Sequence, residues 1–410
     1  MTHKPRTGEL SIMLVAGEPS GDQLGAKLVD SLRRAAGGRR IEFFGAAGVR
    51  MREAGVEPVV DADGLAIMGI AEIAEALPTF LRAFRRLRAE AEHRRPDVTV
   101  LIDFPDFNLR LAKALKNKGH TVVYFVSPQL WGWREYRYRT IRDHVDLLLA
   151  ILPFEREWYA ARGVENVEYV GHPLAGNVIP SMSRNEFRSK FSLDSERPLV
   201  ALLPGSRHKE ISRILPPMIE AAAQLARNVE GVQFAIALAP TRTEEEVAAA
   251  TKEASRGSAD RLPEFTVVKG VTYDLLNASD AAAVASGTAT LEAGLIGVPM
   301  AIVYKTSKLN YKLVRPLINV EHFGLINLIA GKRIVRELIQ DDFTPGALAD
   351  ELRSLLEAAT NSAVRDSLAA AAARLGEGGA SDEAAKAILR IIDAKRSYSS
   401  VDPDPGHGPL

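Results

Sequence analysis

Five short segments place charged, hydroxyl or glycine residues directly after an apolar run. They are Val15-Ala16-Gly17-Glu18-Pro19-Ser20-Gly21-Asp22, Ile102-Asp103-Phe104-Pro105-Asp106-Phe107-Asn108, Ser127-Pro128-Gln129-Leu130-Trp131-Gly132-Trp133-Arg134, Leu203-Pro204-Gly205-Ser206-Arg207 and Ala285-Ser286-Gly287-Thr288-Ala289-Thr290-Leu291-Glu292. In an open parallel sheet, ligands bind in the crevice outside the carboxyl ends of the strands. If the apolar runs are strands of such sheets, these segments are the candidate ligand sites.

Two acids lie three residues apart in the second segment. Asp103 leaves the apolar run directly, and a carboxylate there can act as a general base that deprotonates an acceptor hydroxyl. Asp106 or Asn108 is well placed to cap the helix that follows. The alternative is that both acids are helix caps.

The first segment has the form of a turn between a strand and a helix. Gly17 and Gly21 allow the backbone to approach a ligand closely. Asp22 can cap the helix, whereas Glu18 has no obvious structural duty. The alternative is an ordinary glycine-containing turn.

Two tryptophans in the third segment stand close to a series of arginines. Trp131, Trp133 and Arg134 are followed by further arginines at 137, 139 and 142. Two tryptophans beside an arginine series suit a sugar ring next to an anionic group. The alternative is a packed aromatic loop before a solvated basic helix.

The last two segments have the composition of diphosphate-binding loops. Gly205 and Ser206 can present backbone N–H groups to phosphate oxygens, and Arg207 can add a bidentate contact. Ser286, Gly287 and Thr288 place hydroxyl and N–H groups at a predicted helix amino terminus. Glu292 follows one turn later, where it can bind ribose hydroxyls. The alternatives are a surface turn at Arg207 and a favourable helix-dipole partner at Glu292.

Several common sites are missing from the sequence. There is no Walker lysine motif, no GxGxxG after the first strand and no HxxxH pair with an intervening Glu. These absences argue against a P-loop ATPase and a simple dinucleotide dehydrogenase. His172 stands near the predicted domain boundary, although a lone histidine is more often structural than catalytic.

Short Val/Ile/Leu/Ala runs alternate with helical stretches in both halves, which predicts two parallel sheets covered on both faces. We expect strands at 11–16, 41–44, 97–102, 121–126, 147–152, 167–170, 199–203, 234–238, 265–268, 281–285 and 300–304, with helices at 22–34, 108–118, 213–227 and 381–395. The predicted domains are 1–175, joined by a C-terminal helix at 381–396, and 176–380. That last helix can pack on the first domain or on a second copy of the chain. The polar stretch 397–410 is predicted to be disordered.

The bulk composition fits two globular domains. The 410 residues are 46% hydrophobic and 25% charged, and 52 basic residues balance 52 acidic ones. A strongly basic nucleic-acid binder is disfavoured. The lack of cysteine excludes a disulfide scaffold, a thiolate zinc site and a cysteine nucleophile. We expect no secretory signal and no membrane span, so any membrane contact is peripheral.

Six motifs in order resemble the lipid-A-disaccharide synthase family, whose members have the GT-B architecture of two Rossmann-like domains facing across a cleft. They are the 16–22, 102–108 and 126–134 segments, Leu152-Pro153-Phe154-Glu155, Leu203–Arg207 and Ala285–Thr288. The resemblance covers roughly residues 10–392. It implies transfer of a diacylated glucosamine from UDP-diacylglucosamine to diacylglucosamine 1-phosphate, with a β-linked disaccharide and UDP as products.

The resemblance also implies roles for individual residues. Asp103 corresponds to the family's candidate base and Arg207 to its diphosphate-binding arginine, while Ser286, Gly287, Thr288 and Glu292 correspond to its second nucleotide loop. We assign catalysis to Asp103, Glu18 and Arg207. We assign nucleotide binding to Gly205, Ser206, Arg207, Ser286, Gly287, Thr288 and Glu292. We assign acceptor binding to Ser20, Asp22, Asp106, Asn108, Trp131 and Arg134. No metal or other cofactor is expected.

An acylated substrate needs an apolar surface, and the stretch 68–88 offers one. Ile70, Ile73, Leu77, Leu81 and Phe84, with Phe80 beside them, fall on one helical face, and arginines gather at one end. Such a helix can lie in a membrane interface or bury its apolar face in the core. With a lipid substrate we favour the cytoplasmic face of the inner membrane. The alternatives are another UDP-sugar GT-B enzyme, such as a non-hydrolysing N-acetylglucosamine epimerase, and a non-catalytic nucleotide-binding protein. A homodimer stays open.

Overall fold

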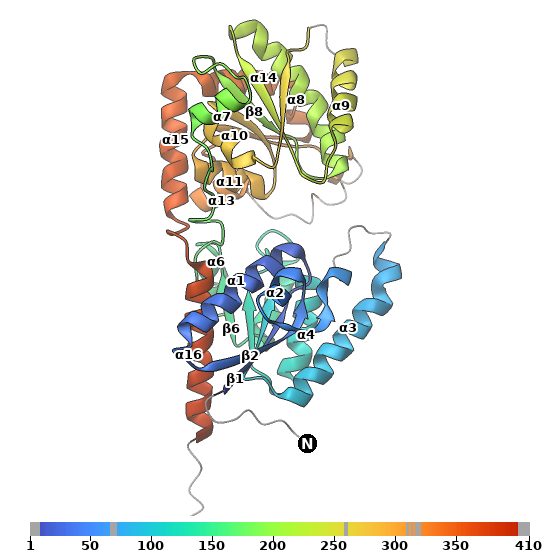
Figure 1. The fold of residues 1–410 in the computed structure, drawn as a ribbon, viewed down its shortest axis with the longest axis vertical. Coiled ribbons are helices and arrows are strands. Elements are labelled where there is room, and N and C mark those ends of the chain that lie inside the picture. The colour runs from blue at the N-terminus through green and yellow to red at the C-terminus, as the bar shows by residue number, and fades with distance from the viewer. Residues whose placement is uncertain are drawn as a thin grey trace, which may run out of the picture. The chain divides into compact units, whose positions relative to one another are not determined.

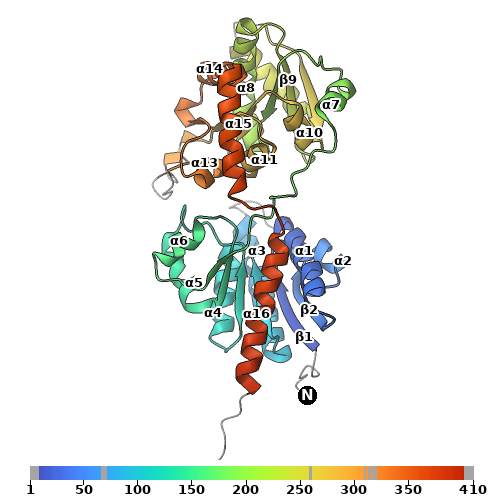
Figure 2. The same ribbon diagram turned by 90° about the vertical axis from the view of Figure 1, so that its left-hand side faces the viewer.

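The computed structural model describes residues 9–65, 72–257, 261–308, 311, 312, 315 and 321–400. Contacts between residues divide the chain into two units. Unit 1 comprises Met1–Pro173 and Gly379–Leu410, and unit 2 comprises Leu174–Gly378. Each unit is built on its own parallel sheet with helices on both faces (Figures 1 and 2). The predicted fold class, a pair of doubly wound α/β domains, is therefore confirmed.

The sheet of unit 1 has the strand order β3-β2-β1-β4-β5-β6-β7, and every printed pair is parallel. Its strands are β1 (Glu9–Val15), β2 (Arg40–Ala47), β3 (Glu57–Asp61), β4 (Val98–Ile102), β5 (Val122–Phe125), β6 (Leu147–Ala150) and β7 (Val167–Tyr169). The direction of winding reverses between β1 and β4. The loops that follow these two strands therefore flank the crevice where open α/β sheets bind ligands.

Successive side chains of β1 point to opposite faces of the sheet and enter the two layers of the hydrophobic core of unit 1. Ile12 and Leu14 pack with α1 (Pro19–Ala35), α2 (Val49–Glu53) and α16 (Ala380–Ser400). Met13 and Val15 pack on the other face. There the helices are α3 (Glu72–Arg94), α4 (Pro105–Lys116), α5 (Tyr138–His144) and α6 (Glu155–Ala160). A strand that is buried on both faces must be apolar throughout, which explains the continuous hydrophobic run in the sequence.

The final helix, α16, belongs to unit 1 although it follows unit 2 in the chain. It packs against α1, and Arg396 joins it to the sheet through an ion pair of 2.8 Å with Asp97. The Asp97 carboxylate also accepts a hydrogen bond from the backbone N–H of Ser11 at 2.8 Å. Residues 397–400 continue this helix, so the prediction that disorder begins at Ser397 was wrong. The rest of the predicted tail lies outside the described residues.

Unit 2 has the strand order β10-β9-β8-β11-β12-β13, again with parallel pairs. The strands are β8 (Leu199–Leu203), β9 (Gln233–Leu238), β10 (Phe265–Lys269), β11 (Ala281–Ala285), β12 (Met300–Tyr304) and β13 (Glu337–Ile339). The winding reverses between β8 and β11. The loops after those two strands are the predicted diphosphate loops, so they flank the ligand crevice of this sheet.

The helices of unit 2 form two layers. One face of the sheet is covered by α8 (His208–Asn228), α9 (Glu244–Gly257) and α14 (Pro345–Leu356). The remaining helices include α10 (Thr272–Ala278), α11 (Thr288–Ile296), α13 (Leu325–Ala330) and α15 (Ala358–Ala373), of which α11 and α13 both contact α15. The first turn of α8 is polar and lacks apolar periodicity, which explains why the sequence predicted its start five residues late, at Arg213.

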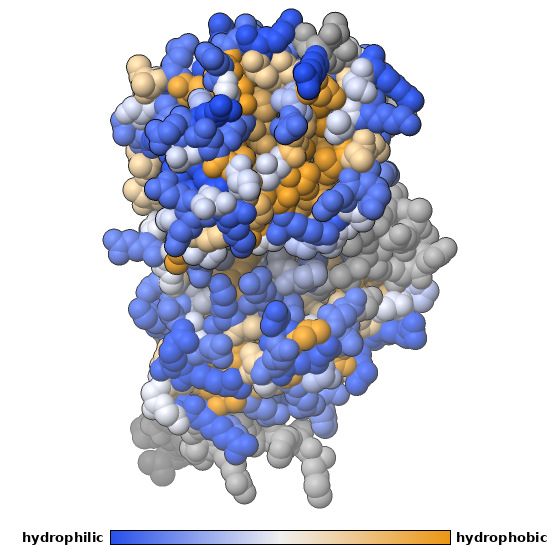
Figure 3. Space-filling model, turned by 45° about the horizontal axis from the view of Figure 1, so that its top comes forward, coloured by the Kyte–Doolittle hydropathy of each residue, from blue (hydrophilic) through white to orange (hydrophobic). Residues whose placement is uncertain are grey.

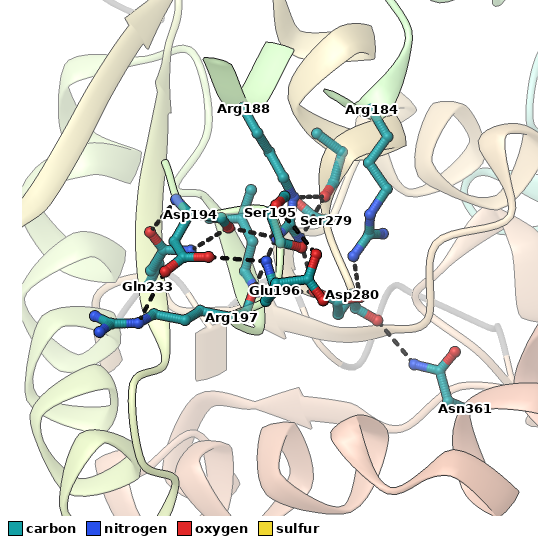
Figure 4. Close-up of polar contacts among 12 residues, drawn as sticks. Arg184, Arg188, Asp194, Ser195, Glu196, Arg197, Gln233, Ser279, Asp280 and Asn361 are labelled. Carbon is teal, nitrogen blue, oxygen red and sulfur yellow. Dashed lines mark hydrogen bonds and ion pairs between the residues drawn. The ribbon is translucent and has the colours of Figure 1, made fainter. Parts of the chain in front are cut away.

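A buried arginine anchors the start of unit 2 to its sheet (Figure 4). Arg188 lies in the short helix α7 (Arg184–Lys190), and its guanidinium is 2.9 Å from an Oδ2 oxygen of Asp280. It also donates to the backbone carbonyls of Asp194, Ser195, Arg197 and Ala278. Asp280 in turn accepts from the backbone N–H of Leu199 at 2.8 Å. These contacts of Arg188 and Asp280 fix the amino-terminal ends of β8 and β11. The predicted ligand loops lie at the opposite, carboxyl ends of the same strands.

Apolar residues gather in a band on unit 2 on the face drawn in Figure 3, with hydrophilic residues on both sides. Among the described residues, no helix combines the length and the apolar character that crossing a bilayer requires.

Candidate active site

Unit 1 contains a pocket of about 380 Å³ at the carboxyl edge of its sheet. The loops that follow β4, β5 and β6 line it, and they contribute Asp103, Pro105, Asp106, Val126, Ser127, Pro128, Gln129, Leu130, Trp133, Arg134, Arg137, Ile151, Leu152 and Glu155. The structure thus brings the second and third predicted segments together with the Leu152–Glu155 motif. The pocket combines three acids, Asp103, Asp106 and Glu155, with two arginines and an aromatic ring.

Asp103 stands at the end of β4 in a conformation that few residues adopt. Its φ is 47° and that of Phe104 is 52°, in the left-handed region. The Asp103 carbonyl accepts hydrogen bonds from the buried hydroxyl of Tyr124 at 2.6 Å and from Asn108 Nδ2 at 2.8 Å. These two donors stabilise a backbone that would otherwise be strained, and such strain clusters at functional sites.

Burial, together with the smaller effect of the nearby negative charge of Glu18, raises the pKa of Asp103 to about 6. A carboxylate with a pKa close to the working pH is well matched to proton abstraction, because it is ionised yet still basic. Glu18 is exposed where β1 leads into α1. The structure therefore places both predicted catalytic acids of unit 1 close enough to interact electrostatically.

The structure overturns the acceptor-binding role predicted for Asp22 and Asn108. Asp22 is buried, and its carboxylate accepts from the backbone N–H groups of Gly48, Arg50 and Met51 at 2.8, 2.8 and 3.1 Å. It therefore caps α2 rather than its own helix. Asn108 is fully buried and donates to the Asp103 carbonyl, so it positions the Asp103 backbone from within the core.

The predicted helix cap was also wrong. The residue that precedes α4 is Phe104, which makes no side-chain cap, and Asp106 lies within the first turn of the helix.

In the loop between β1 and α1, Gly17 is required for a packing reason, since a Cβ there would lie 2.3 Å from the Phe104 ring. Ser20 is exposed in the first turn of α1.

Asp106 is bound by two arginines from the loop that follows β5. Arg134 Nη1 lies 3.0 Å from Asp106 Oδ1, and Arg137 Nη2 contacts the same oxygen. Partial burial acts to raise the pKa of Asp106, but Arg137, Arg134 and Arg110 outweigh it and hold the pKa below its ordinary value. The carboxylate is thus ionised at neutral pH, and the arginines are drawn together at the pocket.

The tryptophan that lines the pocket is Trp133, not Trp131. Trp131 packs its ring edge-to-face on Phe154, with the centroids 5.3 Å apart, and its indole N–H donates to Glu155 at 3.1 Å. In this structure Trp131 fixes the loop through these two contacts, and its predicted contact with an acceptor stays a prediction. The ring of Trp133 lies under the guanidinium of Arg134 at 5.2 Å.

Glu155 lines the pocket and supports its loops, and the sequence assigned no role to it. It is fully buried, and it also accepts from the backbone N–H groups of Ile151 and Leu152 at 3.2 and 3.0 Å. Burial raises the pKa of Glu155 to about 7 despite these hydrogen bonds. One carboxylate thus joins the loop after β5 to the loop after β6. The only sign of its importance in the sequence was its place in the Leu152–Glu155 motif that the chain shares with the family.

In unit 2, the loop after β8 has the predicted turn. Gly205 has a φ of 110°, which favours glycine. The backbone N–H groups of Ser206 and Arg207 donate to Glu210 Oε2 at 3.0 and 3.2 Å, and Arg207 Nη1 donates to Glu210 Oε1 at 2.9 Å. The donors predicted for phosphate do converge, but a protein carboxylate occupies them in this structure.

The loop after β11 leads into α11 through Gly287, whose φ is 151°. The hydroxyl of Ser286 donates to the Phe323 carbonyl at 3.1 Å, and its N–H continues the pairing with β12 by donating to Val303. Thr288 is exposed at the first position of the helix. Glu292 accepts from the Tyr273 hydroxyl at 2.9 Å. Among the predicted groups here, Gly287 and Thr288 offer the most accessible donors.

His172 is buried, and burial lowers its pKa to about 4, so it is neutral near pH 7. Within the described parts of the chain, no three His, Cys, Asp or Glu side chains gather in a way that could hold a metal ion.

The two doubly wound units, each with its predicted ligand loops at the switch point of its sheet, define a GT-B glycosyltransferase fold. Solved structures with this fold match nearly the whole chain. The calicheamicin glycosyltransferase has a TM-score of 0.56 at 16% identity, covering 96% of this chain and 99% of its own. A putative UDP-N-acetylglucosamine 2-epimerase from Listeria monocytogenes has a TM-score of 0.61 at 16% identity, covering 98% and 100%.

Sequence comparison identifies the family within this fold class. The family model for LpxB, lipid-A-disaccharide synthetase, matches residues 12–391. A lipid-A-disaccharide synthase from Myxococcus xanthus is 42% identical over 399 residues, which cover 97% of this chain and 100% of the relative. The chain belongs to the lipid-A-disaccharide synthetase family. It is therefore a glycosyltransferase of lipid A biosynthesis that acts on lipid-linked sugars.

Proposed function

We propose that the enzyme transfers 2,3-diacylglucosamine from its UDP carrier to 2,3-diacylglucosamine 1-phosphate with inversion at the anomeric carbon. The acceptor 6-hydroxyl oxygen forms the new bond to that carbon, while the bond from the carbon to the UDP oxygen breaks and UDP leaves with the electron pair. The hydroxyl proton passes to Asp103. The products are the β-1,6-linked disaccharide 1-phosphate and UDP.

The single observation that supports this proposal most strongly is the environment of Asp103. It lines a pocket at the switch point of the first sheet, has a pKa raised to about 6, and is held by Tyr124 and Asn108. A base that loses its position by 1 Å can lose roughly 100-fold in rate, so such a lock on the backbone favours a catalytic role. The pocket of unit 1 is then the acceptor site.

Unit 2 would bind the donor through its two switch-point loops. Arg207 has a largely exposed side chain, and its guanidinium can leave Glu210 for a diphosphate, which offers more negative charge. Gly205 and Ser206 would add backbone donors, and Gly287 and Thr288 would present the amino terminus of α11. Glu292, oriented by Tyr273, would bind ribose hydroxyls. In the proposed reaction these groups stabilise the departing UDP without a metal or other cofactor.

The lipid substrates require contact with a membrane, and α3 offers a surface for it. Leu77 is 51% and Leu81 47% exposed, and both lie on this helix. Arginines at 82, 85, 86 and 88 follow on the same helix, where they would favour anionic lipid. We place the enzyme peripherally on the cytoplasmic face of the inner membrane.

The test is UDP release from UDP-2,3-diacylglucosamine in the presence of 2,3-diacylglucosamine 1-phosphate. We expect the wild-type chain to release UDP, and Asp103→Asn to lose about 100-fold or more in kcat, the low end of the ~10²–10⁴ that a general base contributes. Asp143→Asn is the matched control, because Asp143 is an exposed carboxylate paired with Arg142. Normal turnover in Asp103→Asn would remove the base role. No UDP release by the wild type would refute the reaction.

A further inference from the structure

The arginine pair at the pocket of unit 1 has the geometry of an anion clamp. Two guanidiniums from one loop reach a single oxygen of Asp106. A pair formed only for stability would more simply use one arginine in a two-oxygen contact with the carboxylate. Here Asp106 Oδ1 takes both contacts, as one oxygen of a phosphate would.

Asp106 is the more exposed partner of both ion pairs, and Arg134 has a second contact that does not involve Asp106. The Arg137 side chain is 17% exposed and that of Arg134 is 39% exposed, whereas the Asp106 side chain is 66% exposed. Arg134 has a left-handed backbone with a φ of 54° and lies over the Trp133 ring. The exposed carboxylate has room to turn toward solvent, and Arg134 keeps its contact with Trp133 when it does.

The arginines next to Asp106 carry more charge than its one carboxylate, while Asp103 and Glu155 line other parts of the pocket. Arg110, Arg134 and Arg137 all act on the one carboxylate of Asp106. A phosphomonoester carries about −1.5 to −2 charges at pH 7 and three acceptor oxygens, so it satisfies two arginines better than a carboxylate does. The clamp and Asp103 line the same pocket, so one molecule can carry both the phosphate and the hydroxyl to be deprotonated.

We propose that Arg134 and Arg137 bind the phosphate of a sugar 1-phosphate acceptor, and that Asp106 fills this clamp in the free protein and is displaced by the phosphate. The proposal rests on the proposed function, because it takes the acceptor to be a sugar phosphate. It assigns to the two arginines the selection of phosphorylated over unphosphorylated acceptors.

The first experiment measures binding without turnover. Titration calorimetry of the full chain compares glucosamine 1-phosphate, glucosamine and UDP. We expect glucosamine 1-phosphate to bind the wild type, and Arg137→Gln and Arg134→Gln each to weaken it about tenfold or more, the effect of losing a charge-assisted hydrogen bond. UDP binding should not change, because it belongs to unit 2. Arg142→Gln, an exposed arginine on α5, is the matched control and should bind like the wild type.

The Asp106→Asn variant tests displacement. Removing the internal competitor should tighten glucosamine 1-phosphate and leave glucosamine unchanged. Weaker binding in Asp106→Asn would show that the carboxylate organises the clamp rather than competing for it. Failure of the wild type to bind glucosamine 1-phosphate, or loss of UDP binding in the arginine variants, would overturn the proposal.

The second experiment compares kcat/KM for the acyl acceptor with and without its 1-phosphate. We expect Arg137→Gln to lower the ratio of the two values about tenfold and to leave the unphosphorylated acceptor unaffected. An equal loss with both acceptors would refute the clamp while leaving the transfer reaction intact. Lack of turnover by the wild type with either acceptor would instead refute the proposed function, and the binding titration would still decide the clamp. If Arg137→Gln fails to fold, Arg137→Lys, which keeps the charge but not the planar fork, should show an intermediate ratio.

Discussion

At the scale of single residues, the environment of Asp103 predicts the pH dependence of the reaction. The pKa of Asp103 is raised to about 6 by burial and by Glu18. A general base must be ionised, so kcat/KM for the acceptor should fall tenfold for each pH unit below about 6. Glu18→Gln removes a negative neighbour, which stabilises ionised Asp103. The acidic limb of the pH profile, where kcat/KM falls, should therefore move to lower pH. The measurement is the pH profile of kcat/KM in the wild type and the variant.

The matched control for Glu18→Gln is Glu53→Gln, which changes an exposed acid of α2 and should leave the limb in place. A limb that stays near pH 6 in Glu18→Gln would show that Glu18 does not act on the base, and a shift to higher pH would contradict the sign of the interaction.

The sequence predicts the chemistry of this site better than its support. Asp103, Glu18 and Arg134 could be found because each follows an apolar run at a strand end. Tyr124 and Glu155 could not, because they act through contacts between residues far apart in the chain. The role of Asn108 was missed because its amide turns back to the Asp103 carbonyl, which the sequence pattern does not indicate. Tyr124 lies 21 positions from the carbonyl that it holds. Asp22 misled for the same reason, since it caps a helix that begins 27 residues later.

At the scale of elements, the central strands were predictable, whereas two of the four edge strands were not. The bounds of β8, β11 and β12 agree with the sequence prediction, because strands buried on both faces are apolar throughout. The edge strands β3 and β13 were missed. They are short and begin with Glu57 and Glu337, so their sequences carry little of the apolar signal.

The helix α3 shows how an amphipathic pattern can serve two surfaces. Phe80 and Phe84 pack toward the core of unit 1, where the ring of Phe80 lies 6.0 Å from Phe104. Leu77 and Leu81 are exposed. Ile70 and the side chain of Ile73 lie outside the described residues. The sequence placed the phenylalanines and leucines on one apolar surface, but the structure divides them between core and solvent.

This division separates stability from the proposed membrane contact. Phe80→Ala should lower the free energy of unfolding by roughly 1–3 kcal/mol, less than the ~3–5 kcal/mol for a fully buried phenylalanine. Leu77→Ser with Leu81→Ser should change it by only about 1 kcal/mol or less, yet weaken co-sedimentation with anionic vesicles. The measurements are chemical denaturation and vesicle co-sedimentation. Unchanged vesicle association in the double variant would count against the role of α3 at the membrane.

At the scale of the whole molecule, each unit has its own core, and unit 1 is assembled from both ends of the chain. Ala384, Ala385, Ile388, Leu389 and Ile392 of α16 are buried in the core that contains β1 and α1. The proposed base and the proposed phosphate clamp stand on the same sheet. The integrity of the proposed acceptor site therefore depends on a helix that follows unit 2 in the chain.

The two cores predict that damage to α16 is felt in unit 1 alone. Ile388 is fully buried against the sheet of unit 1, so Ile388→Ala should destabilise that unit by about 2–5 kcal/mol. Leu352 is equally buried in unit 2, and Leu352→Ala is the matched variant there. Native-state hydrogen exchange, read separately for the amides of β4 and β11, should show faster exchange in β4 for the first variant and in β11 for the second. Equal acceleration in both strands by either variant would mean that the units unfold together. If the units unfold separately, the Ile388→Ala variant should lose acceptor binding at a lower denaturant concentration than UDP binding. The reason is that only the unit that holds Asp103 and Arg137 has been weakened.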